Sequence, residues 1–455
     1  MTVPVPWRPC GSPPRLAGFR RGLPALVLLL TLVGCAGGPR LPQALAPNHL
    51  FRPTARSVIS SPVAYDFDGD GAREVAVGAW DGYFYLLDGE LRDRPGWPKH
   101  SPRGFFASPA LADLDGDGVP EILVTSEAGR LHAWHADGRD AAGFPVDLGA
   151  ELWASPTVLE GGPDGPRIAV GGLERMYLFD RLGRPLAGWP QPMAGWADST
   201  AAYAPGLLAV ATLTRGDPSQ GRLYAWNEDG SLRPGFPIEL RMDSDSSPAL
   251  AQFDRDGRWW IVVGDDAGWV HVVDAEGRPR AGFPVRTLGP KPGPTPTPHP
   301  PGGNVYSVEA SPAVADLTGD GRLEIVVGSW DGRMYVWDDA GRPLPGWPVA
   351  VEDQIISSAA LVDLDGDDRL DIVVGSKDGR LYGWTAQGRP LPGFPYALGA
   401  AVFSSPWVGD LEGDGRADIA VGAVNGIHLL RDVGLLGRAA WPTFHADPQR
   451  TGRAR

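Results

Sequence analysis

Five short segments of this chain carry acidic side chains at every second position, and this spacing suggests metal-ion chemistry. In each segment, side-chain oxygens stand at positions 1, 3, 5 and 9, with glycine or aspartate at position 6. Carboxylates packed this densely repel one another unless a cation lies among them. Such oxygen ligands, with a backbone carbonyl at position 7, suit Ca²⁺. The candidate ligands are Asp66, Asp68, Asp70, Glu74, Asp113, Asp115, Asp117, Glu121, Asp316, Thr318, Asp320, Glu324, Asp363, Asp365, Asp367, Asp371, Asp410, Glu412, Asp414 and Asp418.

The register of these segments favours calcium over solvated Asp/Gly turns, which are the simpler alternative. The last acid follows position 6 by three residues and opens an apolar run, so the segments are not EF-hands. We expect about five Ca²⁺ sites. Three other copies lack the pattern: one has Gln252 and Trp260 at the first and last positions, one ends on Ile168, and one has no acidic loop.

The acidic segments belong to a longer repeat marked by an aromatic residue followed by proline. The prolines are Pro98, Pro145, Pro190, Pro237, Pro284, Pro348, Pro395 and Pro442. Their spacing is 45 to 47 residues, except for one interval of 64. A period held this closely indicates one supersecondary unit copied in tandem.

Each unit reads as four short strands. In the sixth unit, residues 313–316, 323–328, 334–337 and 346–349 are apolar or alternating runs separated by Asp/Gly turns. A single four-stranded sheet of this kind leaves both of its apolar faces exposed to water. When the copies pack radially, each sheet covers the faces of its neighbours. The expected fold is all-β: an eight-bladed β-propeller of four-stranded antiparallel blades.

The predicted propeller spans residues 57–447, with a proline-rich loop insertion at 286–305 and a C-terminal tail at 448–455. Two modes of ring closure stay open. Either Leu50–Pro53 supplies an outer strand to the last blade, or Trp441-Pro442 completes that blade unaided.

The N-terminus reads as a targeting segment, residues 1–34, followed by a linker, 35–56. Arginines precede an apolar run that is too short to span a bilayer. The run ends at Leu32-Val33-Gly34-Cys35, which resembles the lipobox of bacterial lipoproteins. This resemblance implies cleavage before Cys35, lipidation of Cys35 and an extracytoplasmic location at the cell envelope. Because Ala36 is not aspartate, it also implies the outer membrane in a Gram-negative cell; the alternative is an ordinary signal peptide with an incidental cysteine.

The acidic loops, with an apolar strand after each, resemble FG-GAP/VCBS repeats. The sequence Asp-Leu-Asp-Gly-Asp-Gly-x-x-Glu at residues 113–121 carries this resemblance. The repeats are also similar to those in the propeller head of integrin α-subunits. The resemblance covers about residues 57–447. It implies structural Ca²⁺ in the first hairpin of the blades, where the ion braces the fold and is not catalytic.

The sequence contains no recognised catalytic motif. Only Cys10 and Cys35 are present, so the folded body has no thiol nucleophile. The net charge of −14 argues against binding nucleic acid or an anionic membrane surface through charge. We therefore expect a non-enzymatic, monomeric binding, adhesion or assembly platform, held to the membrane by its lipid alone, whose partner is an envelope protein or a glycan.

The alternative is a calcium-dependent, lyase-like polysaccharide enzyme that uses the central channel. Quinoprotein dehydrogenases share the eight-bladed form, but the vicinal cysteine pair that many of them carry is absent. Aromatic residues on the face opposite the calcium loops are candidates for ligand contact, against the simpler view that they pack between blades. They are Trp80, Phe105, Phe106, Trp153, Trp196, Tyr306, Trp330 and Phe403.

Overall fold

In this computed structural model, the described residues are 48–162, 164–214, 220–254, 256–289 and 306–454. All the described residues belong to one compact unit. The predicted signal segment, Cys35, most of the linker and residues 290–305 of the proline-rich loop lie outside the described residues. The described part is all-β and contains no helix, so it also holds no helix that could span a membrane.

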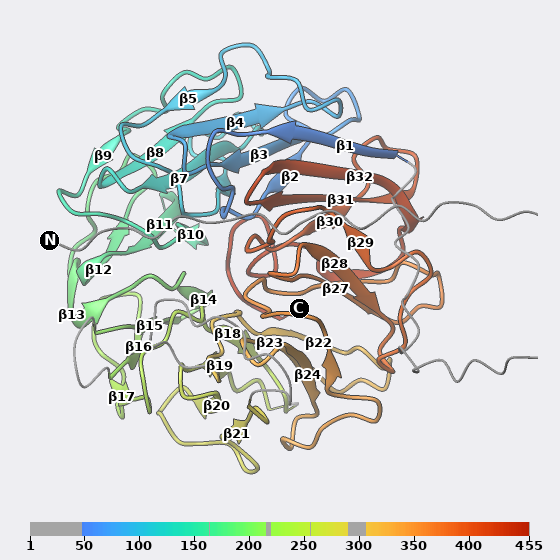
Figure 1. Cartoon of the computed structure of the whole chain (residues 1–455). Helices are drawn as coiled ribbons and strands as arrows, with labels where there is room; N and C mark the ends of the chain where they lie inside the picture. Colours follow the sequence, from blue (N-terminus) through green and yellow to red (C-terminus); the bar gives the residue numbers. More distant parts are fainter. Residues whose placement is uncertain (1–47, 163, 215–219, 255, 290–305, 455) are drawn as a thin grey trace, which may run out of the picture. The chain divides into compact units, whose positions relative to one another are not determined.

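Eight antiparallel sheets form an eight-bladed β-propeller, as the repeat predicts (Figure 1). Blade one is β2 (Val63–Tyr65), β3 (Glu74–Gly78), β4 (Tyr83–Leu87) and β5 (Lys99–His100); blade two is β6 (Ala110–Ala112), β7 (Glu121–Ser126), β8 (Arg130–Trp134) and β9 (Val146–Asp147). Blade three is β10 (Thr157–Gly162), β11 (Gly165–Gly171), β12 (Leu173–Phe179) and β13 (Gln191–Trp196); blade four is β14 (Ala202–Ala204), β15 (Leu207–Thr212), β16 (Arg222–Trp226) and β17 (Ile238–Glu239). Blade five is β18 (Ala249–Ala251), β19 (Trp260–Gly264), β20 (Trp269–Asp274) and β21 (Val285–Arg286); blade six is β22 (Ala313–Ala315), β23 (Glu324–Ser329), β24 (Arg333–Trp337) and β25 (Val349–Ala350). Blade seven is β26 (Ala360–Val362), β27 (Asp371–Gly375), β28 (Arg380–Trp384) and β29 (Tyr396–Ala397), with β33 (Ala439–Trp441) added; blade eight is β30 (Trp407–Gly409), β31 (Arg416–Ala423), β32 (Gly426–Leu435) and β1 (Asn48–Pro53).

In most blades the first two strands are buried along their whole length, which explains their composition. In blade six, β23 is buried along its whole length and is rich in β-branched residues. Asp331-Gly332 then turns the chain into β24, with Gly332 at φ 74°. The aromatic of each aromatic–proline pair packs between blades: Trp97 donates from its indole nitrogen to the carbonyl of Ala136 in blade two, at 2.7 Å.

The Ser-Pro motif of the repeat joins the blades through a closed circle of hydrogen bonds. The backbone N–H of each motif residue donates to the side-chain hydroxyl of its counterpart in the next blade, at 2.9–3.2 Å. The last of these bonds runs from Ser405 in blade eight to Ser61 in blade one. The participants are Ser61, Ser108, Ser155, Thr200, Ser247, Ser311, Ser358 and Ser405, and all are buried.

Breaking this circle is expected to destabilise the propeller. Ser358→Ala removes the acceptor of the Ser311 N–H and leaves a buried donor unsatisfied, which costs about 1–3 kcal/mol. Ser358→Thr should retain most of the stability, because Thr200 already fills the same position in blade four. Urea unfolding of both variants measures the difference; equal midpoints for Ser358→Ala and wild type would contradict the role of the circle.

The ring closes through the N-terminal strand. β1 pairs antiparallel with β32 over six residues, from Asn48 with Arg431 to Pro53 with Gly426 (Figure 1). Of the two predicted modes of closure, the structure has the first, and the strand begins before Leu50. Trp441-Pro442 therefore does not complete blade eight: Trp441 lies in β33, which pairs with the inner strand of blade seven.

The C-terminal segment, residues 442–454, lies along the inner strands and is not a free tail. The N–H groups of five inner-strand residues donate to its backbone carbonyls: Val408, Leu111, Val158, Tyr203 and Leu250, in blades eight, two, three, four and five. Inner strands present unpaired backbone donors toward the axis of a propeller, and this segment supplies their acceptors.

Arg450 joins the C-terminal segment to the inner parts of two blades. It is fully buried, and its guanidinium donates to the carbonyls of Pro109, Ser61 and Pro62 at 2.8–3.3 Å. His445, also buried, has Nε2 2.7 Å from the carbonyl oxygen of Pro248. These two side chains therefore tie blades one, two and five together across the axis.

One detail of the predicted blade differs from the structure. The sequence indicates a last strand over 346–349, whereas β25 contains only Val349 and Ala350. Trp347-Pro348 precedes this strand, because proline cannot donate to the ladder and the tryptophan ring is needed between the blades.

Candidate metal centres and ligand face

The five acidic loops share one backbone geometry, organised by the first aspartate. In blade one, Asp66 Oδ1 accepts from the N–H of Gly69 at 2.7 Å, and Oδ2 accepts from Gly71 at 2.9 Å. The same pair of bonds recurs at the first aspartate of the other four loops, at 2.7–3.1 Å. In blade seven the second donor is Asp368, at φ 65°, where the other loops have glycine. Hydrogen bonds from backbone N–H groups of the loop to its first aspartate therefore hold each loop in this shape.

The last acid of each loop opens the second strand and folds back onto the loop. Glu74 Oε2 accepts from the N–H of Phe67 at 3.1 Å, and the equivalent bonds in the other four loops measure 2.7–2.9 Å. These last carboxylates are buried. The other acids of the loops are more exposed, except Asp363.

Ligand-capable oxygens converge in three of these loops. In blade one, Asp66, Asp68 and Asp70 offer oxygens within 4.8 Å of one another. In blade two the sets are Asp113, Asp115, Asp117 and Asp115, Glu121, His135; in blade seven the set is Asp363, Asp365, Asp371. His135 was not expected from the sequence; its Nδ1 lies 2.9 Å from Glu121 Oε1.

Two observations show that the donor sets fit a cation. First, burial raises the pKa of Glu324 and of Asp371 to about 7, and neighbouring aspartates push in the same direction. A bound divalent cation offsets this cost of keeping the carboxylates charged. Second, Thr318 Oγ1, at position 3 of the blade-six loop, is buried and has no hydrogen-bond partner among the described residues.

Blades three to five depart from this geometry, as the sequence predicts. In blade four the first two strands are joined by Pro205 and Gly206 alone. In blade five, Gln252 takes the first position and Trp260 the last, and Asp254 is bound by Arg280 at 2.7 and 3.1 Å.

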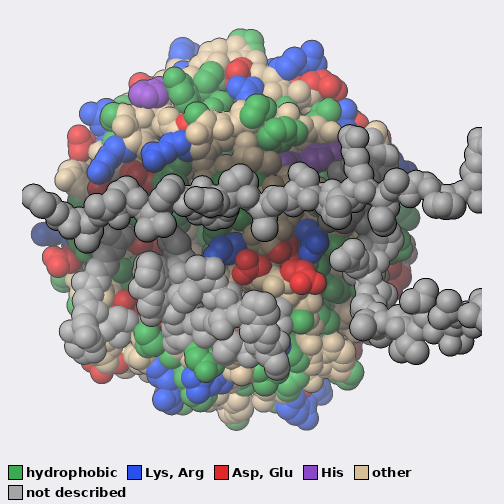
Figure 2. Space-filling view, in the orientation of Figure 1, with side chains coloured by type: hydrophobic (Ala, Val, Ile, Leu, Met, Phe, Trp, Pro, Cys, Tyr) green, Lys and Arg blue, Asp and Glu red, His purple; other side chains and the backbone are tan. Residues whose placement is uncertain are grey.

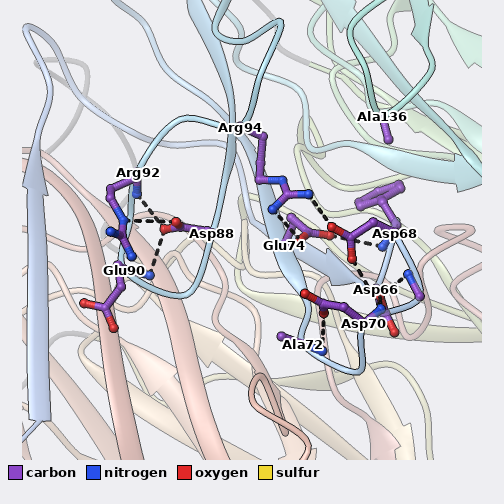
Figure 3. Close-up of polar contacts among 12 residues, drawn as sticks. Asp66, Asp68, Asp70, Ala72, Glu74, Asp88, Glu90, Arg92, Arg94 and Ala136 are labelled. Atoms are coloured by element: carbon purple, nitrogen blue, oxygen red, sulfur yellow. Dashed lines mark hydrogen bonds and ion pairs between the residues drawn. The ribbon is translucent and has the colours of Figure 1, made fainter.

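Sequence reasoning missed the arginines that reach these loops. Arg94 contacts Asp68 and Glu74 in blade one (Figure 3). Arg94 and Arg280 share one signal that was available: each stands three residues before the aromatic of the aromatic–proline pair.

The predicted ligand-face aromatics divide into two groups. Phe105 and Trp330 are buried, with 0% and 2% of their surface exposed, so they are packing residues. The other six are partly exposed: Trp80, Phe106, Trp153, Trp196, Tyr306 and Phe403. Phe106 links Trp80 and Trp153, with ring centroids 6.2 and 5.0 Å apart, so blades one to three share one aromatic strip.

A cavity of about 790 Å³ lies beside the acidic loop of blade one. Its lining includes Tyr65, Asp66, Arg73, Trp407 and Pro442. It thus combines aromatic, acidic and basic groups with the start of the C-terminal segment.

Three segments of the chain match the FG-GAP-like repeat family: residues 53–124, 316–374 and 363–421. The chain is an eight-bladed β-propeller that carries FG-GAP-like repeats in these three segments. The matched segments include all five acidic loops, and residues 125–315 fall outside them.

Solved structures resemble this FG-GAP propeller in fold. Sqt1 from Saccharomyces cerevisiae has a TM-score of 0.60 at 13% identity, with 87% of this chain and 100% of that chain covered. A europium-containing methanol dehydrogenase has a TM-score of 0.58 at 13% identity, covering 84% and 85%. BBS1N, in complex with ARL6DN, has a TM-score of 0.50 at 9% identity, covering 86% and 98%.

These identities are too low to carry function from the solved structures to the FG-GAP propeller. No curated protein matches the sequence significantly.

Proposed function

We propose that this FG-GAP propeller is a calcium-braced, non-catalytic platform, lipid-anchored outside the cytoplasm, that binds an envelope protein or a glycan. The observation that carries the calcium part is the identical folding of five acidic loops around their first aspartate. The ion would be held by the side-chain oxygens at positions 1, 3, 5 and 9 and would link the first hairpin to the second strand of each of these five blades.

The C-terminal segment supports a non-catalytic role. A lyase-like enzyme would need its substrate to reach the axis of the propeller. In this chain the inner-strand donors of five blades are already bonded to residues 442–454. The buried Arg450 and His445 are committed to backbone carbonyls, so neither is a free base for substrate chemistry.

The binding role draws support from the partly exposed aromatic strip of Trp80, Phe106 and Trp153. Aromatic faces stack on sugars and anchor protein partners. The lipid anchor rests on the lipobox at Cys35.

One experiment separates binding from catalysis. The purified protein is incubated in millimolar calcium with a panel of polyuronic acids and other envelope glycans, and both retention and product formation are measured. Retention without turnover, reduced by Phe106→Ala, is the expected result. Turnover of any glycan would overturn the non-catalytic role. If mass spectrometry of the native protein found Cys35 unacylated, the lipid anchor would be wrong.

A further inference from the structure

An arginine from the turn before the outer strand reaches the acidic loop of blade one. The guanidinium of Arg94 is bonded to the carboxylate of Asp68, and its Nη1 lies 3.6 Å from Oε1 of Glu74 (Figure 3). Asp68 and Glu74 are positions 3 and 9 of the loop. The guanidinium therefore contacts two of the carboxylates that a calcium ion in this loop needs.

In blade five, the equivalent arginine makes more contacts with the acidic residue of its loop. Arg280 binds Asp254 with both terminal nitrogens, Nη1 to Oδ2 at 2.7 Å and Nη2 to Oδ1 at 3.1 Å. The indole nitrogen of Trp260 donates to the same Oδ2 at 3.1 Å, and the guanidinium lies 4.8 Å from the centroid of the Trp260 ring. The Arg280 side chain is 11% exposed, whereas 41% of the Asp254 side chain is exposed.

The first and last positions of the blade-five loop carry donors in place of carboxylates, whereas position 5 is still an acid, Asp256. Gln252, at position 1, donates from its side-chain amide to the carbonyl of Gly257 at 2.9 Å. Trp260, at position 9, can only donate. Asp254 thus meets one internal cation and one N–H donor, which together satisfy its charge without a metal ion.

The residue three positions before the aromatic of the aromatic–proline pair differs among the blades. It is apolar in blades two, six and seven, which keep the acidic loop: Ala141, Leu344 and Leu391. It is arginine in blades four and five, which lack the loop, whereas blade three lacks the loop and has Leu186. Blade one combines an intact acidic loop with an arginine at this position, Arg94; in blade eight a different arginine, Arg431, reaches the loop, with Nη2 2.9 Å from Oε1 of Glu412.

We propose that an arginine at this position competes with a metal ion for the loop of its blade, or replaces it. Arg280 is the permanent cation of blade five, and Arg94 competes with Ca²⁺ for Asp68 and Glu74. Blade one is then a weaker calcium site than blades two, six and seven, whose residue at this position is apolar. The part concerning Arg94 rests on the proposed calcium binding of the loops; the part concerning Arg280 does not.

Calcium titration of an Arg94→Leu variant tests the competition. Leucine is the residue that blades six and seven carry at this position, so the exchange suits the fold. Arg92→Leu is the matched control, because Arg92 lies on the same turn but faces Asp88, with Nε 3.1 Å from Oδ2 (Figure 3). Isothermal titration calorimetry on the folded protein, with bound ions counted by native mass spectrometry, gives the affinities.

The expected result is that Arg94→Leu tightens one site, that of blade one, roughly tenfold, whereas Arg92→Leu leaves all sites within about twofold. Equal affinities in wild type and Arg94→Leu would overturn the competition. If wild type bound no calcium at all, the proposed calcium function would fail instead, and the Arg280 experiment would still decide the role of blade five.

Thermal unfolding of Arg280→Leu tests the permanent cation. The melting temperature should fall by the same amount in excess calcium and in excess EGTA, because no metal ion shares this loop. Arg280→Lys, which keeps the charge but loses the two-nitrogen contact, should fall less. An unchanged melting temperature, or a loss that calcium restores, would overturn the assignment.

Discussion

Removing calcium is expected to lower the melting temperature of the propeller by on the order of 10 °C. Loops of this kind bind Ca²⁺ with dissociation constants of roughly 10⁻⁴–10⁻³ M. At tenfold excess over the dissociation constant, each site adds about 1.4 kcal/mol to the free energy of unfolding, provided that the unfolded chain does not bind. Together, five such sites contribute a free energy that is a large fraction of the total free energy of unfolding of an ordinary domain.

Differential scanning calorimetry in 10 mM calcium and in excess EGTA measures this shift, with magnesium as a control for ionic strength. Asp365→Asn, in the blade-seven loop, should reduce the shift by about one site's share. Asp256→Asn, at position 5 of the blade-five loop, should leave the shift unchanged because that loop binds no ion. Identical melting temperatures with calcium and with chelator would refute calcium bracing.

Replacing Arg450 is expected to destabilise the propeller by about 3–5 kcal/mol. Arg450→Met keeps most of the side-chain volume but removes the guanidinium donors to the carbonyls of Pro109, Ser61 and Pro62, of which only Pro62 keeps another donor, Oγ1 of Thr443. These carbonyls are buried at the axis, where water cannot replace the lost donors without opening the segment.

Urea unfolding of Arg450→Met, with Arg453→Met as the control, measures this loss. Arg453 is partly exposed on the same segment, and the substitution at this position should change the free energy of unfolding by less than about 1 kcal/mol. Susceptibility of residues 442–454 to carboxypeptidase should rise in Arg450→Met alone. Equal stability of the two variants would show that the segment does not hold the blades together.

The sequence predicted the blades because every blade repeats the same local rules. Buried β-branched strands such as β23, Asp-Gly turns and the aromatic–proline pair recur at a fixed period, so the fold follows from one unit. The acidic loops were predictable for the same reason, since all their acidic side chains lie within nine consecutive residues. Their shared hydrogen bonds at Asp66 and its equivalents agree with that reasoning.

The parts that the sequence did not reveal occur only once or join distant residues. β1 pairs with β32 across almost the whole chain, and neither ring closure nor register follows from a local pattern. Trp441-Pro442 looks like an eighth copy of the aromatic–proline pair but lies in β33, because blade eight already has its outer strand. Arg94 and Asp68 are 26 residues apart, and only the turn geometry of the blade brings them together.

Blade eight combines strands from the two ends of the described chain, and this has a consequence for how the protein folds as it is synthesised. Blade eight needs β1, which is synthesised first among the described strands, and β30 to β32, which are synthesised near the end. The axis is filled by residues 442–454, which follow all of these strands in the chain. The ring therefore cannot close until these residues have been synthesised, and the sheets made earlier stay in an open array until then.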